Sequence, residues 1–165
     1  MGRLAETLNA LNRGVAYAVR WLAIIMVVVQ FCIVIGRYVF GLNSIAVQES
    51  VLYMHAALFM LAAGYTLQVD KHVRVDIFYA RATEATRRRI DIFGHLFLLL
   101  PSMAALLYWS WPSIVNSWAI FEGPISVGGI KAVFLLKSLI VLFCVLVMLQ
   151  SVAQLIGLLS RNTRE

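Results

Sequence analysis

The feature that most constrains this chain is a set of four long apolar runs that contain no charged residue. They lie at residues 21–36, 50–69, 92–121 and 138–160. Crossing the ~30 Å hydrocarbon core of a bilayer takes about 20 helical residues, and each run reaches that length with its flanks. Composition agrees, because 62% of the residues are hydrophobic and 13% are charged, whereas a soluble domain has about 25% charged residues.

The sequence therefore predicts an all-α integral membrane protein, with one membrane domain over residues 1–165. We expect four transmembrane helices at about residues 18–40, 47–69, 90–118 and 132–160. As a helix, the third apolar run would be about 45 Å long. It must therefore tilt, or its C-terminal part must leave the bilayer. Pro101 and Pro112 are the positions where this helix could kink.

Positive charge is distributed unequally between the two ends of these helices. Of the 14 Lys and Arg residues, 11 lie before the first run, between the second and third, or after the fourth. The other three are Arg37, Lys131 and Lys137. Cytoplasmic loops carry an excess of Lys and Arg, so the bias predicts that both termini are cytoplasmic. We interpret Arg87, Arg88 and Arg89 as topology determinants that face anionic lipid.

Two segments are predicted to lie along the cytoplasmic membrane surface. In residues 3–17, leucines recur at helical spacing while polar residues such as Asn9 and Arg13 fall mostly elsewhere. This pattern is typical of an amphipathic helix that runs into the first span. Residues 76–89 combine Ile77 and Phe78 with a basic face, so we expect a second interfacial helix there. The alternative for both segments is a plain solvated stretch beside the membrane.

The spans carry very little ionisable chemistry. No Asp, Glu, Lys or Arg lies near the middle of any span, which leaves His55 and His95 as the titratable residues there. Ion-coupled carriers place ionisable residues and broken helices at their central site. We therefore expect that this chain does not carry a solute alone, and that it is a subunit of a larger assembly rather than a free-standing catalyst.

Two histidines in a four-helix membrane protein suggest a haem site. In a ~30 Å core, however, their sequence positions place them some 15 Å apart in depth. We expect no haem, metal or other cofactor, and we expect His55, His95 and Gln30 to hydrogen-bond neighbouring helices. Residues 62–64, Ala62-Ala63-Gly64, should allow close backbone approach. A membrane anchor of an electron-transfer complex and a small efflux protein are the rival interpretations.

Three motifs in the loops carry a family resemblance. Arg37-Tyr38-Val39-Phe40-Gly41 closes the first span, Gln48-Glu49 opens the second, and residues 65–76 run through His72, Arg74 and Asp76. Their order and spacing, over about residues 15–158, resemble the small permease subunit of tripartite ATP-independent periplasmic (TRAP) transporters. Two departures are visible. Ala46-Val47-Gln48-Glu49 stands where the family often has Trp-Ser-Glu-Glu, and Lys71 stands where Gly is common.

Further motifs look like one subgroup of that family, linked to mannitol/chloroaromatic or 2-oxoacid uptake. They are Phe121-Glu122-Gly123, Gly128-Gly129 and Leu136-Lys137. The resemblance implies a three-part importer in a bacterial inner membrane, in which a periplasmic binding protein captures an organic acid and a large permease subunit moves it by ion symport. The small subunit would bind the large one and widen its scaffold.

The resemblance leaves two roles open for the motif residues. Arg37, Tyr38, Gln48 and Glu49 either contact a partner subunit or hold the first hairpin together, and we take an Arg37–Glu49 ion pair as the working expectation. His72, Arg74 and Asp76 alternate, so an extended turn would place them on one side. That arrangement suits a clamp that ends the second span, and the alternative is a contact with the large subunit.

Overall fold

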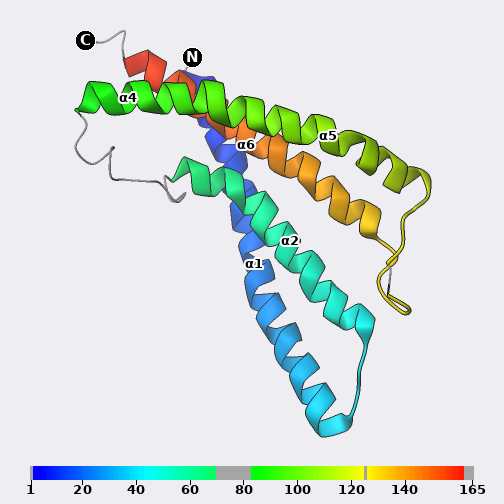
Figure 1. Cartoon of the computed structure of the whole chain (residues 1–165). Helices are drawn as coiled ribbons and strands as arrows, with labels where there is room; N and C mark the ends of the chain where they lie inside the picture. The colour runs from blue at the N-terminus through cyan, green and yellow to red at the C-terminus, as the bar shows by residue number, and fades with distance from the viewer. Residues whose placement is uncertain (1, 70–82, 125, 162–165) are drawn as a thin grey trace.

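The computed structural model describes residues 2–69, 83–124 and 126–161, and this part of the chain is helical apart from its connections (Figure 1). Its elements are α1 (Gly2–Phe40), α2 (Ile45–Gln68), α4 (Glu84–Phe93), η1 (Gly94–Leu99), α5 (Leu100–Ala119) and α6 (Val133–Arg161). α4, η1 and α5 follow one another without a break. The result is four helices long and apolar enough to cross a membrane, which confirms the predicted all-α class.

α1 is one uninterrupted helix of 39 residues, about 58 Å long. Residues 3–17 are therefore the first turns of α1 and do not form a separate helix, in keeping with the expected helix that runs into the first span. The predicted second interfacial helix is not separate where it can be seen, because residues 84–89 begin the long third helix. Residues 76–82 lie outside the described part. Which residues lie in the bilayer stays a prediction.

A glycine ends α1 and starts the turn into α2. Gly41 has φ +68°, in the left-handed region that residues with a Cβ rarely adopt. The turn brings the Leu42 N–H back to the Gly36 carbonyl at 2.9 Å. Ser44 is extended, with φ −116° and ψ 116°, and α2 begins after it. The final Gly of the Arg37–Gly41 motif is thus required by the backbone of this hairpin.

The third helix contains a π-helical segment where a kink was expected. In η1 the backbone hydrogen bonds span five residues instead of four. The Leu100 N–H, for example, donates to the His95 carbonyl. Pro101, next in the chain, has no N–H to continue the α-helical pattern. The wider turn absorbs this loss, so the helix runs on through Pro101, and Pro112 also lies inside α5.

α6 is the central helix of the bundle. A third (33%) of its most apolar window is buried, against 6% or less for the other three candidate spans. The small core consists of Ala63, Leu67 and Val147, with Leu99, Met103 and Phe143 packed against it. The helices meet near the N-terminus of α1 and the end of α6 (Figure 1). From there α1 and α5 point in different directions, so their far ends lie apart. We call this meeting point the terminal end, and the side with loops 41–44 and 120–132 the hairpin end.

Candidate functional site

A buried group of amide side chains joins α1 to α6 at the terminal end. Asn12 is fully buried, and its Nδ2 donates to Gln150 Oε1 at 3.0 Å. Gln150 in turn donates through Nε2 to Asn9 Oδ1 at 2.9 Å. We call Asn9, Asn12 and Gln150 the amide cluster. Hydrogen bonds between membrane helices contribute about 0.6 kcal/mol on average and up to about 1.7 kcal/mol, so this cluster fixes how the first and last helices pack.

A glycine lets α2 approach the amide cluster. A Cβ atom on Gly64 would overlap the side-chain oxygen of Asn12, and it would lie 3.2 Å from the Leu146 carbonyl oxygen. Ala63, the preceding residue, is buried in the core. The prediction that this group of small residues allows close backbone approach is therefore confirmed.

The two histidines occupy different places and do not share a site. His95 is buried in η1, and its Nδ1 lies 3.0 Å from Ser151 Oγ of α6, which confirms the expected hydrogen bond to a neighbouring helix. His55 lies on the exposed side of α2, and nothing in the described part of the chain hydrogen-bonds its ring. The same expectation was therefore wrong for His55 within this chain.

Glu49 ties the start of α2 to the turn before α6. Its Oε2 accepts a hydrogen bond from the Ile130 N–H at 2.7 Å. A Cβ on Gly129 would overlap its carboxylate, so the glycine makes room for it. The Tyr53 hydroxyl donates to the Ile130 carbonyl at 3.5 Å. Glu49 thus connects the two hairpins of the molecule.

The expected Arg37–Glu49 ion pair is wrong, because each residue has a different partner. Arg37 donates through Nη2 to Asn43 Oδ1 at 3.3 Å. Gln48 donates through Nε2 to the same oxygen at 2.7 Å. An amide oxygen in the loop can accept from both sides, whereas the Glu49 carboxylate is engaged by the 129–130 turn. Asn43 therefore organises the α1–α2 hairpin.

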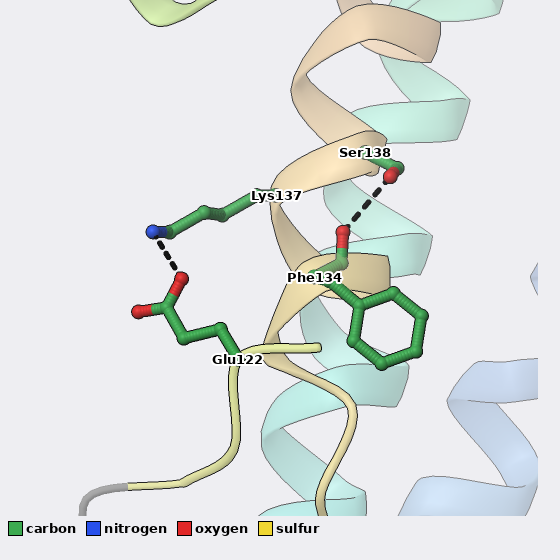
Figure 2. Close-up of polar contacts among 4 residues, drawn as sticks. All are labelled: Glu122, Phe134, Lys137 and Ser138. Carbon is green, nitrogen blue, oxygen red and sulfur yellow. Dashed lines mark hydrogen bonds and ion pairs between the residues drawn. The ribbon is translucent and has the colours of Figure 1, made fainter. Parts of the chain in front are cut away.

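A salt bridge closes the second hairpin (Figure 2). Lys137 Nζ of α6 lies 2.5 Å from Glu122 Oε2 in the loop after α5. The Lys137 hydrogen bond, together with the positive charge of Lys137, holds the pKa of Glu122 below its ordinary value. The next residue of α6, Ser138, donates to the Phe134 carbonyl at 2.8 Å and accepts from Trp118 Nε1 at 2.8 Å. Both ends of the loop are therefore fixed to α6.

An open groove runs between α1 and α2 near the hairpin end. It encloses about 680 Å³. Its lining residues are Met26, Val27, Gln30, Arg37, Gln48, Val51, Leu52 and His55. Gln30, expected to hydrogen-bond a neighbouring helix, has no hydrogen-bond partner among the described residues and is exposed in the groove. The groove is thus the place where polar side chains of the spans face outward.

Comparison with protein families decides what kind of protein this is. The family described as "Tripartite ATP-independent periplasmic transporters, DctQ component" matches residues 14–161. The chain belongs to this family. No curated protein matches the chain, and no solved structure does. The small-subunit resemblance of the loop motifs is thereby confirmed at the level of the family.

Membership makes the chain the small permease subunit of a TRAP transporter, a component of a transport system. With four helices among its described residues that are long and apolar enough to cross a bilayer, it is a multi-pass membrane protein. TRAP systems in general pair this subunit with a large permease and a binding protein. The family assignment does not favour the rival electron-transfer anchor.

The remaining motif residues of this small TRAP subunit differ in what surrounds them. Tyr38 is 82% exposed at the end of α1. Arg87 and Arg88 are partly buried and Arg89 is exposed in the first turns of α4. His72, Arg74 and Asp76 lie outside the described residues. Their roles as partner contacts, clamp or topology determinants stay predictions.

Sequence reasoning missed the residues that join the helices of this TRAP subunit. Neither Asn12 nor Gln150 was singled out, although both are buried and paired. A signal was present in α6, where Gln150 and Gln154 stand four residues apart in a mostly apolar helix and so share a face. Gln154 Nε2 donates to the Leu67 carbonyl at 2.7 Å, so this polar face marks the side of α6 that packs on α1 and α2.

Proposed function

We propose that this chain is the scaffold subunit of a TRAP transporter that imports organic acids across a bacterial inner membrane by ion symport. The large permease subunit contains the transport pathway, and a periplasmic binding protein delivers the carboxylate. Both termini of the small subunit lie in the cytoplasm, so the hairpin end faces the periplasm. The support for this orientation is the concentration of Lys and Arg outside the hairpin end.

The proposal rests on which contacts the polar side chains of this chain make. The amide cluster and the His95–Ser151 pair join helices at the terminal end. Glu49 and the Glu122–Lys137 salt bridge fix the loops at the hairpin end. A carrier assembles polar groups around a shared site near mid-membrane. The paired polar groups of this chain instead connect helices to one another and to the loops, which supports a scaffold role.

The substrate proposal is narrower and rests on the loop that follows α5. Glu122, Gly128, Gly129 and Lys137 belong to the motifs that resemble the mannitol/chloroaromatic or 2-oxoacid subgroup. We therefore propose a 2-oxo acid or a chlorinated aromatic carboxylate as the imported acid. Recognition of the acid takes place on the other two components.

The experiment is uptake by proteoliposomes assembled with one component omitted at a time. The complete set contains this chain, its large permease subunit and the binding protein, and uptake of labelled 2-oxo acids and chlorobenzoates is followed under imposed sodium and proton gradients. We expect uptake by the complete set and none when this chain, or either other component, is left out.

Two results would contradict the proposal. Uptake by this chain alone would make it a carrier rather than a scaffold. Full uptake by the large subunit and binding protein without this chain would remove its role in transport. A Soret band in the purified chain that shifts on reduction would instead favour the electron-transfer anchor.

A further inference from the structure

The α1–α2 groove presents two polar side chains toward the outside of the bundle. Gln30 of α1 and His55 of α2 both line it, and both are exposed. Neither has a hydrogen-bond partner within the described parts of the chain. The amide cluster and the His95–Ser151 pair, by contrast, use their polar groups to join helices within the bundle.

Both side chains lie well inside the predicted spans. Gln30 precedes Arg37 by seven residues, and His55 follows Gln48 by seven, which is about 10 Å of helix in each case. Arg37 and Gln48 bond to the loop residue Asn43, which places them at the end of the hairpin. Gln30 and His55 therefore lie at matching depth, about 10 Å below the level of the loop.

The surrounding groove is apolar at this depth. Met26, Val27, Val51 and Leu52 form its walls, and hydrocarbon there offers no hydrogen-bond partner to an amide or an imidazole. A phospholipid headgroup stays at the interface, about 10 Å above the two side chains, and its acyl chain has no polar atom. Another protein helix is the occupant that can bring a polar side chain to this depth.

We propose that this groove receives a transmembrane helix of the large permease subunit. That helix presents a hydrogen-bonding side chain to Gln30 and His55, and an acceptor to the remaining guanidinium donors of Arg37, which has one bond to Asn43. The apolar walls give the helix its packing surface, and the polar pair fixes its register and depth. The inference rests on the proposed function, since it names the face by which the small subunit binds the large one.

The direct test is site-specific photocrosslinking in the assembled complex. A photoreactive amino acid replaces Leu52, which is 55% exposed in the groove, or as controls Val28 and Phe59, which are 56% and 69% exposed on the same two helices outside its lining. We expect a crosslink to the large subunit from position 52, and weaker or no such crosslink from positions 28 and 59.

A second measurement uses Gln30→Leu and His55→Leu. Neither side chain bonds within the described part of this subunit, so both variants should fold with unchanged helicity. The loss of one interhelical hydrogen bond should weaken retention of the large subunit roughly 3- to 20-fold for each change. Val28→Leu and Phe59→Leu should leave retention unchanged.

The outcomes separate this inference from the proposed function. If position 52 crosslinks to lipid or to a second copy of this chain while a control position captures the large subunit, the groove assignment fails and the scaffold role stands. If no large subunit co-purifies with the unaltered chain, the proposed function itself fails. Retention unchanged by both leucine variants would overturn the role given to the polar pair.

Discussion

At the scale of single residues, the bundle depends on one position where a side chain would not fit. Gly64 lies against the Asn12 side chain and the Leu146 carbonyl, so the backbone of α2 meets a side chain of α1 and the backbone of α6. Close approach of this kind stabilises membrane helices through dispersion contacts and short hydrogen bonds. The amide cluster keeps its geometry only while this position stays small.

Replacing Gly64 with alanine should destabilise the bundle by about 1–3 kcal/mol, because the added Cβ overlaps Asn12 and forces the helices apart. The matched control is Gly14→Ala in α1, where a Cβ meets nothing within 4 Å and alanine should stabilise the helix by up to about 1 kcal/mol. Unfolding of both variants in mixed dodecyl-maltoside and SDS micelles, followed by circular dichroism, gives the comparison. Equal free energies of unfolding for the two variants would contradict the close approach.

At the scale of elements, the α5–α6 hairpin is closed by charge and by hydrogen bonds together. The Val133 N–H donates to the Glu122 carbonyl at 3.2 Å, next to the Glu122–Lys137 salt bridge. The ring of Phe134 packs edge-on against Trp118, with ring centroids 4.7 Å apart. The loop is thus held where it enters α6, and its ionic part depends on pH.

The pH dependence follows from the lowered pKa of Glu122, whose ordinary value is 4.5. The unfolded chain takes up a proton at a higher pH than the folded chain does. The salt bridge therefore stabilises fully above about pH 4.5, and its contribution is lost as pH falls through the lower folded pKa. We expect hydrogen exchange of the Val133 amide to accelerate in this acid range in the wild type.

Glu122→Gln is the control for this effect, because it keeps the size of the side chain but cannot ionise. Its Val133 exchange, corrected for the intrinsic pH dependence, should stay flat over the same range. A wild type as insensitive to acid as Glu122→Gln would show that the salt bridge does not hold the loop.

At the scale of the whole molecule, the predicted orientation can be tested with cysteine labelling. Cys32 and Cys144 are both free thiols, so they are first replaced by alanine. Val127, 93% exposed in the loop before α6, and Thr7, exposed near the start of α1, are then replaced singly by cysteine. In intact cells with a permeable outer membrane, an impermeant maleimide should label position 127 directly and position 7 only after the inner membrane is opened.

The reverse labelling pattern would place both termini outside and overturn the interpretation of the arginine-rich loops. Labelling of both positions in intact cells would mean that the chain crosses the membrane an even number of times between them, and not three times. Either result is independent of which partner the chain binds, so topology and function are tested separately.

The helices of this molecule could be predicted from the sequence, whereas several of the contacts between them could not. The four helices follow from uninterrupted apolar runs, which have few alternatives in a bilayer. The pairing of Asn12 with Gln150 joins residues 138 positions apart, and periodicity within a helix says nothing about which polar faces will meet. Glu49 shows the same limit. Arg37 was its expected partner, but the Glu49 carboxylate accepts instead from the Ile130 N–H of another loop.

The π-helical segment η1 has a consequence for how this helix tolerates length changes. A π turn accommodates one additional residue in a helix. The segment Gly94–Leu99 therefore takes up one extra residue and keeps the faces of α4 and α5 in register. Deleting one residue within it should let a regular helix form while the tryptophan-bearing face of α5 keeps its direction. The same deletion further along, at Ala105 for example, would turn everything beyond it by about 100°. Insertions and deletions among related chains should therefore collect in this one turn.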